Sequence, residues 1–176
     1  MPTDFLKTPV QTKPSEYNFD KFLIEGKDFI IIKETNFERI RNQIKANQSK
    51  IIIFQASTDE ELNRKVLEKI KINIYLSPET NQEKDRLKQR SSGLNQVLCK
   101  IAKQNKITIG INLSKINNSK ILARIKQNIK LCRKSKTRIV VGTFAKNQDE
   151  LRDAKDIESL FISLGMSTHQ IKELFY

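Results

Sequence analysis

The residue types that catalyse hydrolysis are sparse in this 176-residue chain, which contains one histidine, two cysteines and five glycines. The histidine, His169, lies in a polar stretch close to the end of the sequence, where we expect a solvated surface position. A serine or cysteine nucleophile would lack its base, and a metal-dependent hydrolase needs several histidine and aspartate ligands. No glycine-rich phosphate loop occurs. The sequence therefore predicts no catalytic residue, no metal site and no cofactor in this chain.

Two glutamates and the two cysteines are the remaining candidates for chemistry. Glu34 and Glu79 each follow a predicted strand, and in principle they could pair as acid and base. A capping or salt-bridge role fits each of them better. Cys99 and Cys132 lie inside apolar helical patterns without metal-ligand spacing, so we expect small buried side chains in a reducing compartment.

Lysine and arginine are the abundant functional residues. They number 33 against 20 acids, which gives a net charge of +13 and a pI near 9.8. Such an excess repels itself unless a polyanion offsets it, and phosphate contacts favour lysine and arginine in any sequence context. A composition biased towards lysine would not explain the shortage of acids. Nucleic acid is therefore the expected partner.

The basic residues cluster in two places. Between Lys115 and Arg138 no acid occurs, and the basic side chains there avoid the apolar helical stripe. Before Gly93, a basic loop leads into a helix N-terminus, where backbone N–H groups can receive a phosphate. The predicted RNA-binding residues are Arg86, Lys88, Arg90, Ser91, Ser92, Lys120, Arg124, Lys126, Lys130, Arg133, Lys134, Arg138, Lys146 and Arg152. The alternatives are an ordinary solvated helix face and a mobile polar loop.

The elements that position these residues alternate along the chain. Short β-branched runs predict strands at 29–32, 51–54, 72–76, 107–113 and 138–141, and helical apolar stripes lie between them. This order predicts βαβ units, a parallel sheet and an α/β fold class. Five strands are too few for a closed (β/α)₈ barrel. We expect an incomplete barrel or an open sheet in one domain, 27–176, preceded by an extended arm, 1–26.

Cap signals mark three helix ends. Thr58 with Glu61 predicts a capping box at one helix start, and Ser167 with Gln170 predicts another. Gly165 is expected to end the helix that carries the stripe at 157–164.

Several classes of protein are excluded by pattern. No apolar run approaches the roughly 18 residues of a membrane span, and no signal peptide is visible, so a soluble, cytoplasmic protein is expected. Aromatic residues make up 7% of the chain and tryptophan is absent, which disfavours a stacking platform for single strands. RNP, GXXG and zinc-knuckle motifs are missing too. Structured RNA, recognised by its shape and phosphates, fits best.

Two stretches resemble the archaeal ribonuclease P protein component 3 family, which corresponds to the thirty-kilodalton subunit of the eukaryotic enzyme. The first stretch consists of LSPE at 76–79, SGLNQVLCKIA at 92–102 and ITIGIN at 107–112. The second consists of NIKLCR at 128–133, RIVV at 138–141, DELR at 149–152, DI at 156–157 and LGM at 164–166. The resemblance extends over about 27–176 and is most specific in 76–166.

This resemblance implies a fold like that of the polymerase-and-histidinol-phosphatase barrels, without their metal ligands. It also implies a subunit that acts with a catalytic RNA to cleave 5′ leaders from precursor tRNA, while the Mg²⁺ belongs to the RNA. The usual partner is ribonuclease P protein component 2, in a heterodimer or heterotetramer.

Two departures from the family pattern are visible. The family has two further strand–helix units at its N-terminus, which 1–26 are too short to supply, so the chain looks N-terminally shortened and closure of the barrel is in question. The turn at 142–145 reads GTFA instead of a Ser-Gly-Ala type. Because an open sheet leaves exposed edges, we expect the arm to lie against the domain or a partner.

Two other functions stay open at this point. One is a general basic protein that binds structured RNA without a role in processing. The other is a degenerate phosphoesterase barrel, which would need metal-binding histidines at strand ends.

Overall fold

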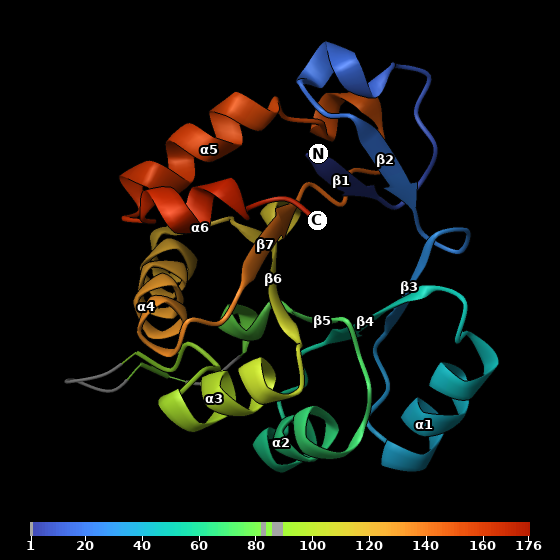
Figure 1. Ribbon diagram of the computed structural model, residues 1–176, viewed down its shortest axis with the longest axis vertical. Coiled ribbons are helices and arrows are strands. Elements are labelled where there is room, and N and C mark those ends of the chain that lie inside the picture. The colour runs from blue at the N-terminus through green and yellow to red at the C-terminus, as the bar shows by residue number, and fades with distance from the viewer. Residues whose placement is uncertain (1, 82–83, 86–89) are drawn as a thin grey trace.

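The structure, a computed structural model, describes residues 2–81, 84–85 and 90–176. Its centre is a five-stranded parallel sheet in the order β3-β4-β5-β6-β7 (Figure 1). The strands are β3 (Phe29–Ile32), β4 (Ile51–Gln55), β5 (Ile74–Leu76), β6 (Thr108–Asn112) and β7 (Ile139–Gly142). All five predicted strands are confirmed, as is the α/β fold with parallel strands. Buried β-branched side chains explain why these short runs form strands.

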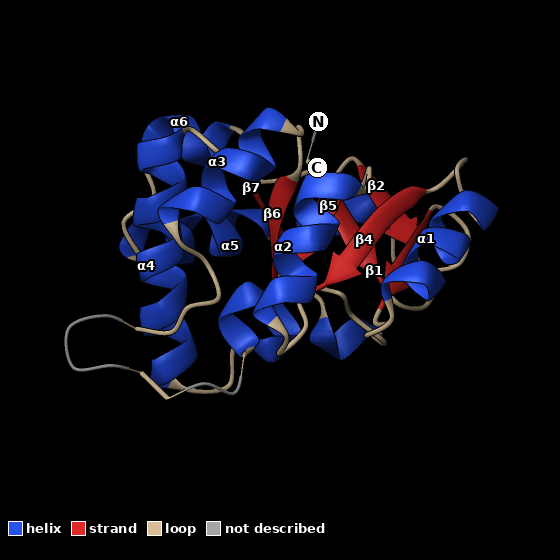
Figure 2. Cartoon of the chain, turned by 90° about the horizontal axis from the view of Figure 1, so that it is seen from below, coloured by secondary structure: helices blue, strands red, loops and turns tan. Residues whose placement is uncertain are grey.

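Helices surround the strands on the outside, as Figures 1 and 2 show. The helices are α1 (Phe37–Ala46), α2 (Glu60–Lys69), α3 (Gln96–Gln104), α4 (Ser119–Ser135), α5 (Ala154–Ser163) and α6 (Thr168–Lys172). Their apolar stripes pack on the outer face of the sheet in one large core, which includes Ile40, Val66, Ile125 and Phe161. Cys99 and Cys132 are fully buried in this core with free thiols, as predicted.

The segment before the sheet is more regular than the expected arm. It contains β1 (Thr3–Leu6), the 3-10 helix η1 (Pro14–Tyr17) and β2 (Lys21–Ile24), and β1 pairs with β2 in parallel. Isolated bridges then join Leu6 to Ala145 and Glu25 to Phe29. This segment therefore supplies two short strands, with a single 3-10 turn in place of a helix between them.

β1 is attached firmly beside the end of β7. The Phe144 N–H donates to the Phe5 carbonyl (2.8 Å), and the Lys7 N–H donates to the Ala145 carbonyl (2.9 Å). The buried Asp4 carboxylate accepts from the Thr143 N–H (2.7 Å) and hydroxyl (2.6 Å). The segment is thus ordered against the domain and covers the edge at β7, as expected.

A second core lies inside the curve of the strands. Its buried members come from the sheet, from β1 and β2, and from the turn after β7: Phe5, Leu23, Phe29, Ile53, Ile74, Leu76, Val140 and Phe144. Gly110 on β6 faces the same core, and a Cβ there would lie 2.6 Å from Ile74 Cγ2. The strands therefore enclose a filled interior, as in an incomplete barrel.

The helix ends agree with the cap signals at two of three places. Ser167 and Gln170 form the predicted capping box, and Gly165 adopts φ +95 after α5. The prediction for Thr58 is wrong, because Asp59 is the N-cap of α2 and its side chain accepts from the Leu62 N–H. In the part of the chain that the structure describes, no helix has the length and apolarity needed to cross a membrane.

Candidate nucleic-acid interface

The loop that follows β5 packs on α4 through Arg124, Gln127 and Asn128. Ser77 adopts a left-handed conformation (φ 53), and η2 (Pro78–Thr80) follows it. The chain returns through Gly93 (φ +70), where a Cβ would lie 2.1 Å from the Pro78 carbonyl oxygen. Glycine is therefore required where the two ends of this loop pack together. Asn95 then caps α3 by accepting from the Leu98 N–H.

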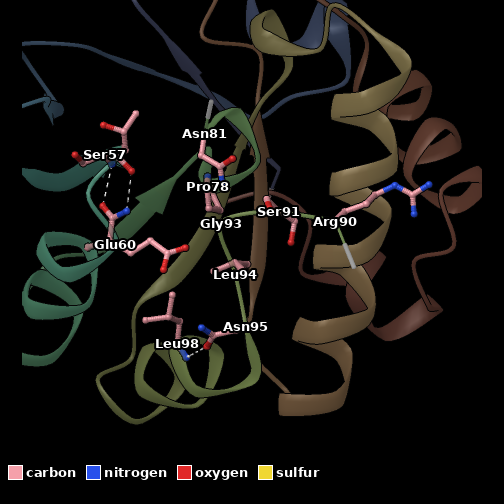
Figure 3. Close-up of a pocket in the computed structure, with 13 residues that line it drawn as sticks. Ser57, Glu60, Pro78, Asn81, Arg90, Ser91, Gly93, Leu94, Asn95 and Leu98 are labelled. Carbon is pink, nitrogen blue, oxygen red and sulfur yellow. Dashed lines mark hydrogen bonds between the residues drawn. The ribbon is translucent and has the colours of Figure 1, made fainter. Parts of the chain in front are cut away.

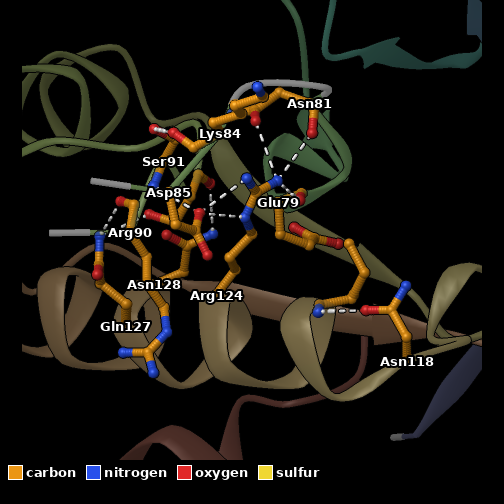
Figure 4. A network of polar contacts seen from close by, with 12 residues as sticks. Glu79, Asn81, Lys84, Asp85, Arg90, Ser91, Asn118, Arg124, Gln127 and Asn128 are labelled. Carbon is orange, nitrogen blue, oxygen red and sulfur yellow. Dashed lines mark hydrogen bonds and ion pairs between the residues drawn. The ribbon is translucent and has the colours of Figure 1, made fainter. Parts of the chain in front are cut away.

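Arg124 anchors this loop from inside (Figure 4). Its guanidinium donates to the carbonyl oxygens of Glu79 (3.0 Å) and Asn81 (2.8 Å) and pairs with the Asp85 carboxylate (2.8 Å). The side chain is 1% exposed. The expectation that Arg124 offers its charge on the surface is therefore wrong. Its position on the helix explains this, because Arg124 continues the apolar stripe of Ile121 and Ile125.

Asp85 completes the anchor. Desolvation acts to raise the pKa of the Asp85 carboxyl, but the hydrogen bonds from Arg124 and from the Ser91 N–H, with the charges of Arg124 and Lys120, outweigh it and lower the pKa below its ordinary value. Asp85 is therefore ionised at neutral pH and ties both ends of the loop to α4.

A second tie holds the returning strand of the loop. The Gln127 amide donates to the Arg90 carbonyl (2.9 Å) and to the Ser92 hydroxyl (2.9 Å), and the Asn128 amide donates to the Ser92 carbonyl (3.1 Å). Ser92 is 1% exposed. The prediction that Ser92 contacts RNA is wrong, since its groups are used inside the fold. Ser91 and Arg90 lie at the surface where the loop packs on α4.

A polar cavity of about 300 Å³ opens beside the loop (Figure 3). It lies between the starts of α2 and α3, and its lining includes Ser57, Glu60, Asn63, Ser91 and Asn95. The Asn63 amide is already bonded to Ser57, and Asn95 serves as a helix cap. Arg90 also contributes to the lining, but Figure 3 shows its guanidinium extending away from the other lining side chains. The cavity therefore presents hydroxyl groups and backbone groups of the loop at the surface. It also contains the Glu60 carboxylate, which would repel an anion.

The exposed side of α4 carries a run of basic side chains. Lys120, Lys126, Lys130, Arg133 and Lys134 are all exposed. The 17 residues of α4 extend over roughly 25 Å, so this basic face extends along one wall of the molecule. We call Lys126, Lys130 and Lys134 the α4 stripe, because a spacing of four places them on the same side.

The other predicted residues lie elsewhere. Arg133 donates to the Gly165 carbonyl (2.7 Å), and Arg138 donates to the Phe175 carbonyl (2.7 Å), so both help to hold the C-terminal segment while staying exposed. Arg152 donates to the Asp149 carbonyl (2.8 Å), and Lys146 follows the turn after β7. The predictions for Arg86 and Lys88 lie outside the described residues.

The acid–base candidates do not meet. Glu34 accepts a hydrogen bond from Gln43 (3.5 Å), and His169 is exposed, 3.8 Å from the Glu173 carboxylate. Glu79 is fully buried, and its carboxyl oxygens have no hydrogen-bond partner in another residue. The predicted capping or salt-bridge role of Glu79 is therefore wrong. Burial raises its pKa to about 8, against opposing effects of its own backbone N–H and of Arg124.

Sequence reasoning missed Asp4 and Lys7. Burial raises the pKa of the Asp4 carboxyl to about 6, although hydrogen bonds from Thr143 and Phe5 lower it in part. Asp4 belongs to β1 and Lys7 directly follows it, and no strand was predicted there. Among the described residues, no group of three or more histidine, cysteine, aspartate or glutamate side chains is placed to hold a metal ion.

No family model matches the chain. It is 24% identical over 140 residues to ribonuclease P protein component 3 of Methanococcus vannielii, which covers 76% of this chain and 58% of the relative. The same component of Methanosarcina acetivorans is 28% identical over 151 residues, or 82% of this chain and 60% of the relative. The chain thus spans about three fifths of these relatives.

A solved structure has a similar fold. A chain in a cryo-EM structure of archaeal ribonuclease P with mature tRNA superposes with a TM-score of 0.72 and 18% sequence identity, covering 98% of this chain and 76% of that one. These comparisons confirm the resemblance that the motifs predicted.

Proposed function

We propose that this chain is a component 3 type protein subunit of ribonuclease P, which binds the RNA of the enzyme and stabilises its active shape for removal of 5′ leaders from precursor tRNA. The observation that carries the proposal is the basic face of α4, with an internally anchored loop beside it. Similarity to ribonuclease P protein component 3 supports it. A protein that binds only the folded RNA shifts the RNA's equilibrium towards that state.

In this proposal the chain contributes charge and rigidity, and the reaction belongs to the RNA and its Mg²⁺ ions. The exposed lysines of α4 are flexible point charges that suit phosphates of any base sequence. The chain would be a degenerate relative of the polymerase-and-histidinol-phosphatase barrels without a catalytic site of its own. It would work in the cytoplasm and pair with ribonuclease P protein component 2.

The test is salt-dependent RNA binding by a variant of the α4 stripe. We expect Lys126→Gln, Lys130→Gln and Lys134→Gln together to weaken binding to ribonuclease P RNA and to flatten the slope of log K against log salt by roughly 0.7–0.9 for each lost phosphate contact. The matched control replaces Lys45, Lys69 and Lys71, which are exposed near the ends of α1 and α2. Equal slopes for the wild type and the α4 variant would contradict this RNA surface.

Activity separates this role from general RNA binding. With component 2, the RNA and Mg²⁺, the wild-type chain should increase cleavage of precursor tRNA, and the α4 variant should increase it less. RNA binding without any effect on cleavage would favour a general basic RNA-binding protein. Robust cleavage by the chain alone would favour a phosphoesterase.

A further inference from the structure

Four lysines stand just beyond the carboxyl ends of parallel strands. Lys7 follows β1 and Lys33 follows β3. Lys115 ends η3 (Leu113–Lys115), the turn directly after β6. Lys146 follows Ala145, which is bridged to β1 after the end of β7. Because parallel strands direct their carboxyl ends to one side of a barrel, these side chains gather at one mouth of the fold. We call them the mouth lysines.

Contacts between the segments support this arrangement. The Lys7 N–H donates to the Ala145 carbonyl (2.9 Å), and the Thr8 hydroxyl donates to the Lys146 carbonyl. Burial lowers the pKa of the Lys7 ammonium, and repulsion from Lys33, Lys146 and Lys115 lowers it further, while Glu25 raises it in part. All three other lysines therefore act on the charge of Lys7 across space, although they are distant in sequence.

The positive charge at this mouth is poorly neutralised by the protein. None of the mouth lysines forms an ion pair with a residue that the structure describes. One nearby carboxylate, Glu25, raises the pKa of Lys7 without forming an ion pair with it, and two others accept hydrogen bonds. Asp4 is bonded to Thr143, and the Glu150 carboxylate accepts from the backbone N–H of Lys146. Like charges held together in this way favour binding of an anion.

A polyanion fits these four charges better than a single small phosphate. The lysines come from four separate segments, and each is a flexible point charge. Lys115 also precedes the start of α4 by only four positions, so the mouth lysines adjoin Lys120 and the basic face of that helix. An RNA that lies along α4 would pass directly to the mouth.

We propose that the mouth lysines form a second RNA-backbone site, which receives phosphates at the carboxyl end of the strands and extends the α4 surface around the molecule. The inference rests on the proposed RNA-binding function and assigns Lys7, Lys33 and Lys115 to it alongside Lys146. Each bound phosphate releases counterions, and it also relieves the repulsion that Lys33, Lys115 and Lys146 exert on Lys7.

The experiment uses the full chain with Lys7→Gln, Lys33→Gln, Lys115→Gln and Lys146→Gln, and ribonuclease P RNA as the probe. We expect the salt slope to flatten by roughly 0.7–0.9 for each lost contact, with an unchanged or higher melting temperature. The matched control replaces Lys45, Lys69, Lys71 and Lys100, which lie on or beside α1, α2 and α3, and should keep the wild-type slope. If the fourfold variant does not fold, the pairs Lys7 with Lys146 and Lys33 with Lys115 replace it.

The outcomes distinguish the site at the mouth lysines from the proposed RNA-binding function on which it rests. An unchanged slope for the mouth variant, with a flatter slope for the α4 variant, would overturn the inference and leave the proposed function standing. Loss of component 2 binding with intact RNA binding would also overturn it, because the mouth would then be a protein interface. Absence of RNA binding by the wild type would overturn both.

Discussion

Arg124 shows how one side chain can have a structural role within a functional region. Its guanidinium is buried and satisfies two carbonyl groups and Asp85, so α4 and the loop after β5 form one unit. The charge of Arg124 is therefore neutralised inside the fold, whereas neighbouring lysines of α4 expose their charges to solvent.

Replacing Arg124 with Gln should lower the free energy of unfolding by about 3 kcal/mol, because the loop carbonyls and Asp85 lose their partner. Urea denaturation measures this change. The control, Lys126→Gln on the same helix, should stay within about 0.5 kcal/mol of the wild type. Equal stability of the two variants would show that Arg124 does not anchor the loop.

The buried carboxyls predict how stability depends on pH. Burial raises the pKa of Asp4 to about 6 and of Glu79 to about 8, from ordinary values of 3.8 and 4.5. The folded state therefore binds more protons than the unfolded state within these windows, and stability falls as pH rises through them. Below the ordinary values both states are protonated and the effect ends.

The substitution Glu79→Gln should remove the part of the pH dependence of stability that lies at the higher pH values. The variant should lose less stability than the wild type between pH 4.5 and 8, because it has no charge to bury. Thermal melts across this range test the prediction, with exposed Glu61→Gln as the control. If the stability of the variant depends on pH as strongly as that of the wild type, Glu79 is not the group responsible.

At the scale of elements, β1 closes the fold beside β7. Phe5 stacks on Phe144 with ring centroids 5.5 Å apart and meets Phe29 edge-on at 5.2 Å. Asp4, the residue before Phe5, is bonded to Thr143, the residue before Phe144. The N-terminal segment is therefore part of the inner core.

Phe5→Ala should destabilise the protein by about 3–5 kcal/mol, as expected for a buried phenylalanine. The control, Val10→Ala, removes a half-buried side chain of the same segment and should cost much less. Melting temperatures measure both. If Phe5→Ala lowers the melting temperature only slightly, the N-terminal segment contributes little to the stability of the domain.

At the scale of the whole molecule, local patterns predicted most of the architecture. β-branched runs and apolar stripes are local signals, and they placed five strands and the helices between them. β1 and β2 could not be predicted in this way, because β1 is four residues long and its Asp4 finds its partner 139 positions away.

The candidate site was predicted less well than the fold. Charge density identified α4, but it could not separate buried from exposed basic residues. The stripe of Ile121, Ile125 and Ile129 could have shown that Arg124 and Asn128 face inward. The mouth lysines depend on which strand ends meet, and the missed strand β1 concealed Lys7.

The proposed function requires that this chain bind the RNA of ribonuclease P. The most direct measurement is sequencing of the RNA that copurifies with the native protein, beside that of the α4 variant. Ribonuclease P RNA should be strongly enriched with the wild type and recovered in smaller amounts with the variant. Enrichment of ribosomal or mixed RNA, equal for both proteins, would contradict the proposed function.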